Sequence, residues 1–428
     1  MKLIIKNGRV LLFEKDKAVV KKVDIGIENS KIVQVGEISE GFGADKIIDA
    51  NNMLVMPGFI NTHTHLAMNL FRNYADDMLL QDWLTKKIWP LEKKLTAEAV
   101  YWASVLGIAE LIKSGVTGFL DMYFFVEETI KVALETGVRA YIARGLTDEP
   151  LGMEFQLKET KELYRKFDGK DGRIKIFAGP HAPYTCSPRY LKKVKALADE
   201  LGIGIHIHLS ETRQEVNDSI KQWRKTPIKH VYDLGIFERP TIAAHCVHVD
   251  DDDIQILKEC NVSVAYNPTS NLKLASGFAP VEKMVKAGVN VSLGTDGASS
   301  NNNLNMFEEI HLASIVNKCV NNDAVSIPAE TAIKMATING AKALGVDGEL
   351  GSIDVGKKAD IILIDLNKPH LCPLHNPLSA VCYCAQASDV HTVIVDGKIL
   401  MENYELKTID LEKAMYNTAR CAQKLTGA

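Results

Sequence analysis

VMPGFINTHTH, residues 55–65, has the composition of a buried strand that ends in polar side chains. Seven more β-rich runs come after it, each followed by a helical pattern; they cover residues 116–122, 139–146, 174–181, 203–211, 241–247, 262–268 and 289–296. Eight strand–helix units over about 250 residues or more are typical of a (β/α)8 barrel. An open doubly wound sheet also alternates, but its first turn is usually glycine-rich, unlike this one. We therefore predict an α/β protein with a TIM barrel over residues 59–344.

The two ends of the chain carry a different pattern, in which turns separate short β runs. Turn-forming pairs occur at Asn29-Ser30, Asn51-Asn52 and Asp396-Gly397, and the last pair is a strong signal for a two-residue hairpin. Neither end alone has enough strands for a stable sheet. We therefore predict that residues 1–58 and 345–428 pair into one small composite β-sandwich domain.

Composition excludes several classes of function. The chain has 428 residues, and 50 Lys and Arg against 54 Asp and Glu leave a net charge of −4, so we expect no nucleic-acid surface. No stretch approaches the roughly 20 apolar residues that cross a bilayer. Lys6, Asn7 and Arg9 interrupt the first apolar run, so we expect no signal peptide. The eight cysteines form no C-x-x-C pair. These features predict a cytoplasmic protein with no nucleic-acid or membrane partner.

Histidines gather at one end of the predicted barrel. Several of the twelve lie at the carboxyl ends of predicted strands, where TIM-barrel active sites are built; they are His63, His65, His181, His208 and His245. Asp296 has the same position on the eighth strand. A purely structural histidine has no reason to prefer this rim, so the shared position predicts a functional site.

The spacing of these histidines indicates a metal site. His63 and His65 are two residues apart on a strand, so both side chains point to one face. His206 and His208 share a face in the same way. We assign the ligand to His208, which is nearer the rim, and leave His206 as a supporting or core residue.

Two further residues, His245 and Asp296, lie at the same rim. Taken alone, His245 is more often a buried core histidine, and Asp296 a helix cap or turn carboxylate. Together, three histidines and one aspartate form a nitrogen and oxygen set that suits Zn²⁺ or another divalent ion. Such an ion lowers the pKa of a water molecule to about 7 and supplies hydroxide at neutral pH.

Long motifs spread over the chain resemble one family. They are PGFINTHTHL at 57–66, DWLTKKIWPLEKKLT at 82–96, DMYF at 121–124, ARGL at 143–146, AGPHAPYTCS at 178–187, HLSET at 208–212, AAHCVH at 243–248, NPTSNLKLASG at 267–277 and GTDGASSNN at 294–302. The chain resembles the amidohydrolase superfamily essentially from end to end. Within it, the chain is most similar to the 5-methylthioadenosine/S-adenosylhomocysteine deaminases and the 5′-deoxyadenosine deaminases.

The resemblance implies a reaction and a substrate class. A hydrolase of this kind would convert the 6-amino group of 5′-modified adenosines to a carbonyl and release ammonia. Its substrates would be 5′-methylthioadenosine, S-adenosylhomocysteine, 5′-deoxyadenosine or adenosine, and its products the inosine analogues. We also expect a homo-oligomer, a dimer or a tetramer.

Roles for individual residues are implied in the same way. One divalent metal ion, with Zn²⁺ as first choice, would be held by His63, His65, His208 and Asp296. The implied catalytic residues are Glu211, His245 and Asp296. The implied substrate contacts are Glu92, Arg144, His181, Glu211 and Asp296. Trp83 and Trp89 would wall the nucleoside pocket or only pack.

The implied mechanism is attack of hydroxide on C6 of the adenine ring. Asp296 and His245 would deprotonate and orient the nucleophile. Glu211, protonated at that stage, would pass its proton to N1 before ammonia leaves. The fourth strand ends in FAGPH without the lysine of binuclear relatives, so the resemblance implies a single ion.

One departure from the family bears on the substrate. Members that act on S-adenosylhomocysteine carry a second arginine shortly after the one that matches Arg144, but residues 147–156 hold no arginine and three acids. This favours neutral 5′-substituents, unless Arg165 or Arg173 reaches the pocket. Two alternatives stay open: another amidohydrolase activity, on guanine, cytosine, a pterin or a cyclic amide, and a non-catalytic assembly protein.

Overall fold

The computed structural model describes residues 1–15, 17–148 and 152–427. Eight parallel strands form a sheet in which neighbours in space are neighbours in the chain. They are β8 (Phe59–Thr64), β9 (Val116–Tyr123), β10 (Arg139–Leu146), β11 (Ile174–Pro180), β12 (Ile205–Leu209), β13 (Thr241–His245), β14 (Ser263–Tyr266) and β15 (Asn290–Leu293). Each strand overlaps one of the eight predicted runs, and the predicted barrel fold is confirmed.

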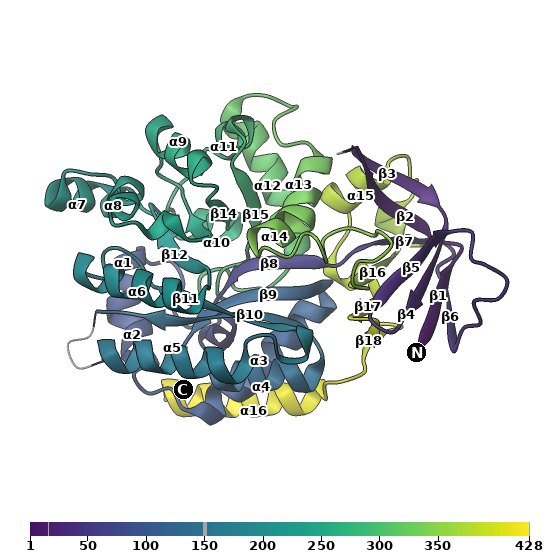
Figure 1. Cartoon of the computed structure of the whole chain (residues 1–428), viewed down its shortest axis with the longest axis horizontal. Helices are drawn as coiled ribbons and strands as arrows, with labels where there is room; N and C mark the ends of the chain where they lie inside the picture. Colours follow the sequence, from purple (N-terminus) through teal and green to yellow (C-terminus); the bar gives the residue numbers. More distant parts are fainter. Residues whose placement is uncertain (16, 149–151, 428) are drawn as a thin grey trace.

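Helices lie around this sheet (Figure 1). They are η1 (Leu66–Phe71), α1 (Leu80–Trp83), η2 (Leu84–Ile88), α2 (Trp89–Glu92), α3 (Ala97–Lys113), α4 (Val126–Thr136), α5 (Met153–Phe167), η3 (Lys170–Gly172), α6 (Pro188–Leu201), α7 (Arg213–Trp223), α8 (Pro227–Asp233), η4 (Ile236–Glu238), α9 (Asp251–Glu259), α10 (Pro268–Lys273), α11 (Val281–Ala287), α12 (Met306–Asn321), α13 (Ala329–Ala336) and α14 (Ile338–Ala343). Local signals set their starts. The hydroxyl of Ser187, for example, accepts the N–H of Tyr190 and caps α6, whose first residue is Pro188.

The first and last barrel strands meet beside the predicted site. The N–H of Asp296 donates to the carbonyl of His63 at 3.0 Å, and the N–H of Thr295 donates to Oδ1 of Asn61 at 3.1 Å. Gly294 permits this approach, because a Cβ there would lie 2.7 Å from the Cβ of His63. The closure of the barrel therefore brings Asp296 to His63.

The run 55–65 divides into two strands at Gly58. β7 (Met53–Pro57) pairs with strands outside the barrel, whereas β8 enters it. A Cβ at Gly58 would lie only 2.2 Å from Cγ2 of Thr117, so a larger residue does not fit at this crossing. The polar carboxyl end of the run belongs to β8, as the site requires.

Two further sheets use strands from both ends of the chain. One has the order β19-β18-β17-β16-β7-β2-β3 and the other β5-β4-β1-β6. Their remaining strands are β1 (Lys2–Lys6), β2 (Arg9–Glu14), β3 (Lys17–Lys22), β4 (Asp24–Glu28), β5 (Lys31–Gly36), β6 (Lys46–Asp49), β16 (Ile361–Asp365), β17 (Val390–Val395), β18 (Lys398–Glu402) and β19 (Glu405–Leu406). Leu3, Ile25, Val55 and Leu363 share one buried core, so the predicted additional sheet domain is present at one end of the molecule (Figure 1). Asp396 and Gly397, with φ of 52° and 74°, form the predicted turn between β17 and β18.

The helices after β16 are η5 (Pro369–Leu371), α15 (Pro377–Tyr383), η6 (Ala387–Asp389) and α16 (Leu411–Thr426). Two of them pack on the barrel rather than on the sheets. α15 contacts α12 and α13, and α16 lies along α3 (Figure 1). The predicted domain limits, 1–58 with 345–428 and 59–344, stay a prediction.

Among the described residues, no single helix is both long and apolar enough to cross a membrane. Leu80–Glu92 and Ala97–Lys113 reach the required length only as a pair, and that pair bends by 117°.

Candidate active site

The predicted site residues meet at the carboxyl ends of the barrel strands. His208 lies on β12, His245 ends β13, and Asp296 follows β15. A cavity of about 1620 Å³ opens at this end, and its lining includes every predicted site residue except one; the lining members are Glu92, Arg144, His181, His65, His208, Glu211, His245 and Asp296. The exception, His63, is fully buried beneath the cavity.

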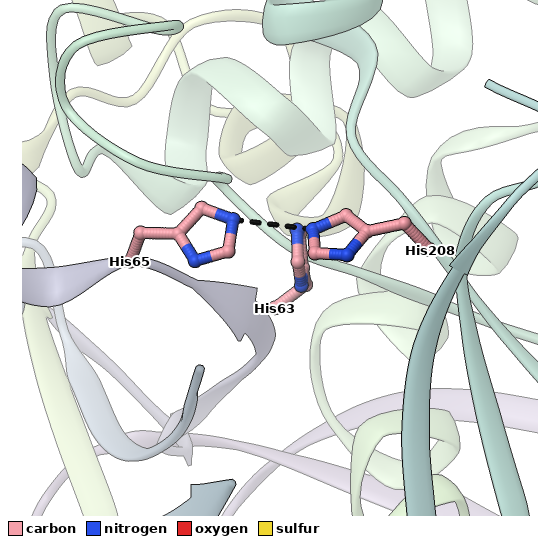
Figure 2. Close-up of side chains that lie close together, drawn as sticks. All are labelled: His63, His65 and His208. Atoms are coloured by element: carbon pink, nitrogen blue, oxygen red, sulfur yellow. Dashed lines mark hydrogen bonds between the residues drawn. The ribbon is translucent and has the colours of Figure 1, made fainter. Parts of the chain in front are cut away.

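The rings of His63, His65 and His208 converge from two strands (Figure 2). Nε2 of His65 and Nε2 of His208 lie 3.2 Å apart. One ligand atom from each of the three residues lies within 4.8 Å of the other two, and His63, His245 and Asp296 form a second group that meets the same limit. These overlapping groups define one candidate metal site.

A chain of hydrogen bonds determines which nitrogen of His63 carries a proton. Nδ1 of His206 lies 3.1 Å from the carbonyl of Ile242, which can only accept, so this nitrogen is protonated. Nε2 of His206 is then the acceptor for Nδ1 of His63, at 2.8 Å. Nε2 of His63 is left with a bare lone pair, and it is buried without a hydrogen-bond partner. His206 thus orients the ring of His63, which is the supporting role, one of the two left open for it.

The same logic applies to His65 and His208. Nδ1 of His65 lies 2.5 Å from the carbonyl of Met122, and Nδ1 of His208 lies 2.7 Å from the carbonyl of His181. In the neutral form of each ring Nε2 is therefore unprotonated, and the two Nε2 atoms face each other at 3.2 Å. Two lone pairs at that distance repel unless a cation lies between them. The donor set fits a divalent ion such as zinc.

Burial keeps the rings of His63 and His208 in the neutral form. It lowers the pKa of His63 to about 3 and the pKa of His208 well below its usual range. A buried imidazole that stays neutral at pH 7 offers its lone pair to a metal without first losing a proton.

Asp296 is held by neighbours that leave its carboxylate charged. Oδ2 accepts the hydroxyls of Ser270 at 2.6 Å and Ser300 at 2.8 Å, and Oδ1 accepts the N–H of Gly297 at 2.7 Å. Oδ1 also lies 3.4 Å from Nε2 of His63. A hydrogen-bonded carboxylate beside three imidazole lone pairs completes the nitrogen and oxygen set predicted from the sequence.

His245 differs from His63, His65 and His208 in which ring nitrogen carries the proton. The amide nitrogens of Asn271 and Asn267 lie 2.8 Å and 3.3 Å from Nδ1 of His245, so Nδ1 accepts. The neutral ring therefore carries its proton on Nε2, which lies 3.8 Å from Oε2 of Glu211. This proton suits hydrogen bonding to a substrate or a water molecule rather than coordination.

Glu211 is a buried acid at the same rim. Burial, reinforced by the charge of Asp296, raises the pKa of Glu211 to about 8, so its carboxyl group is mostly protonated at neutral pH. Its Oε1 accepts the hydroxyl of Ser276 at 3.3 Å. A protonated acid in a cavity is the form that a general acid requires.

Strained backbone marks three of the strand ends. Ser210, His245 and Asp296 have φ of 53°, 73° and 60°, a left-handed region that costs free energy for residues other than glycine. Each of these residues is a site residue or adjoins one. The strain is retained where it orients the side chains of the cavity.

The outer cavity contains the predicted substrate contacts. Burial raises the pKa of Glu92. Trp83 and Trp89 both line the cavity, which agrees with a wall role without excluding packing. Nδ1 of His181 lies 2.8 Å from the hydroxyl of Thr185.

Arg144 faces the cavity as an ion pair rather than as a free cation. Its Nε donates to Oε2 of Glu159 at 2.8 Å, and its guanidinium lies 5.6 Å from the ring centre of Phe124. The two other arginines considered from the sequence do not line the cavity: Arg165 lies in α5, and Arg173 donates to the carbonyl of Val138. Glu149, Pro150 and Leu151 of the arginine-free stretch lie outside the described residues.

Sequence reasoning missed several supporting residues. Glu215 accepts the backbone N–H groups of Ser210 and Glu211 at 2.9 Å and 2.8 Å, and Asn271 sets the proton of His245. Only the position of Glu215 in the first turn of a helix, directly after HLSET, was a usable signal. Asn271 lies inside a quoted motif, but nothing in the motif says which ring it contacts.

Comparison with known proteins identifies the family. The profile of the amidohydrolase family matches residues 54–400, so the chain belongs to that family and the resemblance drawn from its motifs is confirmed.

Relatives of known name lie close to this chain. It is 56% identical, over 99% of both chains, to a 5-methylthioadenosine/S-adenosylhomocysteine deaminase of Caldanaerobacter subterraneus subsp. tengcongensis. It is 48% identical to a 5′-deoxyadenosine deaminase of Methanosarcina acetivorans, over 99% of this chain and 98% of the relative.

A solved structure supports the same placement. The crystal structure of an adenosine deaminase from Xanthomonas campestris with bound zinc aligns with a TM-score of 0.96 at 35% identity. The alignment covers 100% of this chain and 99% of that one.

Proposed function

We propose that this protein is a metal-dependent deaminase of 5′-modified adenosines. The observation that carries the proposal is the facing pair of unprotonated nitrogens on His65 and His208, 3.2 Å apart, at the floor of a cavity that also holds a protonated acid. Relatives named as deaminases of 5-methylthioadenosine, S-adenosylhomocysteine and 5′-deoxyadenosine support the substrate class.

The residues that would hold the ion are His63, His65, His208 and Asp296. We propose one divalent ion per chain, with Zn²⁺ as first choice, because the donor set is nitrogen-rich and a zinc-bound structure is similar. When bound, the ion polarises water and lowers its pKa so that a hydroxide is available at neutral pH.

The chain's own residues then divide the proton work. Hydrolysis adds one water: its oxygen bonds to C6, the C6–N6 bond breaks, and ammonia leaves. The carboxylate of Asp296 would accept the proton of the attacking water. The Nε2–H of His245 would donate to the same oxygen and orient it. Glu211 would give its proton to N1, which relieves the negative charge that the attack places on the ring. The proton taken up by Asp296 would then pass to N6, so that the leaving group is ammonia. The hydroxyl proton of the adduct would return to Glu211 as the carbonyl forms.

The cavity supplies the binding part of the proposal. Glu92 would accept hydrogen bonds from the ribose hydroxyls, and His181 and Arg144 would complete the substrate contacts. The expected cytoplasmic location and the expected homo-oligomer stay predictions.

A substrate panel tests the proposal directly. Ammonia release is measured with each of two groups of compounds. The first group is 5′-methylthioadenosine, S-adenosylhomocysteine, 5′-deoxyadenosine and adenosine. The second group, the alternative substrates, is guanine, cytosine and a pterin, and hydrolysis of a cyclic amide is measured beside them. We expect turnover of the 5′-modified adenosines and little or no turnover of the alternative substrates. Turnover of an alternative substrate alone, or no turnover of any compound, would contradict the proposal.

Metal analysis tests the site independently of substrate. We expect about one divalent ion per purified chain, and its loss in the His65→Asn and His208→Asn variants. His391→Asn on β17, outside the cavity, is the matched control and should retain the ion. A full complement of metal in the two site variants would refute the ligand assignment.

A further inference from the structure

The substrates named for the relatives differ in the substituent at the 5′ position of the nucleoside, and the residues that line the cavity bear on that difference. A 5′-methylthio group is small and neutral, whereas a homocysteinyl group ends in a carboxylate and an ammonium. The following inference rests on the proposed function and concerns which of these ends the cavity accepts.

The cavity has room beyond a nucleoside. Its volume of about 1620 Å³ exceeds the roughly 300–1,000 Å³ of ordinary small-molecule sites. Away from the metal-site residues, the end of β10 and the start of α5 form its wall, with Arg144, Asp148, Phe155 and Glu159. A 5′-substituent that extends toward this wall meets these side chains.

Arg144 is the cation that would be expected to attract a carboxylate, but its charge is already paired with a carboxylate and two of its five N–H groups already have acceptors. Nε donates to Oε2 of Glu159 at 2.8 Å, and Nη1 donates to the carbonyl of Gly145. The two side chains are only 13% and 29% exposed, so water screens the pair weakly. The positive charge of Arg144 is therefore paired with a carboxylate of the protein itself.

The surroundings of this pair are apolar or acidic. The rings of Phe124, Phe125 and Phe155 line the same cavity, and Phe125 and Phe155 are 44% and 66% exposed. The carboxylate of Asp148 accepts the N–H of Ser187 at 2.9 Å and adds negative charge. Such a wall favours a thioether or a methyl group and disfavours a second carboxylate.

Two other cations line the described part of the cavity, and both are exposed. Lys93 lies next to α2 and Lys221 lies in α7. A long substituent would have to reach one of them to find a free positive charge. The experiment below therefore includes a variant that tests whether one of these lysines binds the carboxylate of the substituent.

We propose that Glu159 is a specificity-determining residue: by holding Arg144 in an ion pair among aromatic rings, it makes the site select neutral, apolar 5′-substituents over those that end in a carboxylate. The proposal predicts the ratio of kcat/KM between the two substrates. kcat/KM for 5′-methylthioadenosine should exceed kcat/KM for S-adenosylhomocysteine in the unchanged protein.

The test compares that ratio in Glu159→Gln. The amide keeps the shape but removes the charge that neutralises Arg144. We expect the S-adenosylhomocysteine to 5′-methylthioadenosine ratio to rise about tenfold, which is the order of one hydrogen bond to a charged group. In Glu159→Gln with Arg144→Met the rise should disappear, because the freed guanidinium is its cause.

Controls separate this effect from loss of any acid on α5. Glu154→Gln removes a carboxylate from the same helix, but Glu154 pairs with Lys193 and does not line the cavity, so the ratio should stay unchanged. Glu159→Ala provides a second removal of the charge if the glutamine variant folds poorly, which circular dichroism reports.

Three results would overturn the inference: an unchanged ratio in both Glu159 variants, a preference of the unchanged protein for S-adenosylhomocysteine, or a selective loss of S-adenosylhomocysteine turnover in Lys221→Met. Failure of the proposed function differs from all three, because then no 5′-modified adenosine would release ammonia.

Discussion

At the residue scale, the positions of protons on four histidine rings divide the site into two kinds of nitrogen. Carbonyl groups hold the protons of His65 and His208 on Nδ1, and the relay through His206 does the same for His63. An amide nitrogen reverses the pattern at His245. Nitrogens that offer a lone pair to a cation and a nitrogen that carries a proton can therefore coexist at one rim of the barrel.

Replacing the buried acid tests the catalytic assignment. Glu211→Gln cannot deliver a proton to the ring, so we expect kcat to fall by about 10²–10⁴ while the metal content stays normal. Turnover assays and metal analysis of the same sample provide the two readouts. Glu200→Gln, an exposed acid of α6, is the control. Near-normal kcat in Glu211→Gln would end the role of Glu211 as the proton donor.

The acid also predicts a pH dependence. Burial raises the pKa of Glu211 to about 8, so the protonated, active form prevails below that pH and is lost as the pH rises through it. A profile of kcat/KM between pH 6 and about 10 should therefore fall on its alkaline side. A profile that stays level across this range would show that the donor is another group.

At the element scale, the turn from β12 into α7 acts as a support for Glu211. The carboxyl group of Glu215, in the first turn of α7, accepts the backbone N–H groups of Ser210 and Glu211, and Ser210 has a left-handed φ of 53°. Without these bonds the turn would lose the interactions that offset its strain. Glu215 is thus a positioning residue, since it contacts backbone and not the reacting atoms.

Removal of this support should cost stability. Glu215→Ala leaves two buried N–H groups without an acceptor, so we expect the free energy of unfolding to fall by about 2–4 kcal/mol. Urea denaturation measures the change. Gln214→Ala, a neighbour whose side chain bonds only to exposed Asp218, should stay within about 0.5 kcal/mol of the unchanged protein. Equal effects of the two variants would contradict the assignment.

At the scale of the whole molecule, a buried ion cluster joins the barrel to the sheet domain. Arg139, at the start of β10, donates from Nε and Nη2 to both oxygens of Asp360 and from Nη2 to Asp396 at 2.8 Å. Its side chain is only 3% exposed. The cluster ties the amino-terminal end of the barrel, opposite the site, to the loops of the second domain.

Breaking this cluster should destabilise the whole chain. Arg139→Met leaves buried Asp360 without its cation and leaves Asp396 with Lys358 alone, at 3.4 Å, so we expect a loss of about 3–5 kcal/mol in the free energy of unfolding. Lys161→Met removes a partner from an exposed pair with Glu200 and should change it by less than about 1 kcal/mol. Chemical denaturation measures the free energy of unfolding of both variants. A loss below about 1 kcal/mol in Arg139→Met would contradict the stabilising role of the ion cluster.

Much of the fold was predictable from local pattern. The period of the β runs, the helical pattern after each, and turn pairs such as Asp396-Gly397 act over a few residues and therefore survive in the sequence as a readable signal. The run 55–65 divides at Gly58, the last residue of the predicted end segment 1–58, but the steric reason for the break, Thr117 on the next strand, is not readable from the run itself. The packing of α16 on α3 is hidden for the same reason.

The sequence by itself determined the order of strands and helices, the residue types at the strand ends and the membership of the family, because these depend on short periods and contiguous motifs. Only the tertiary structure decided the proton positions of the histidines, the support of Glu211 by Glu215 and the pairing of Arg144 with Glu159. Each of those depends on a distance between side chains brought together by folding, and burial then fixes the charge state that the distance allows.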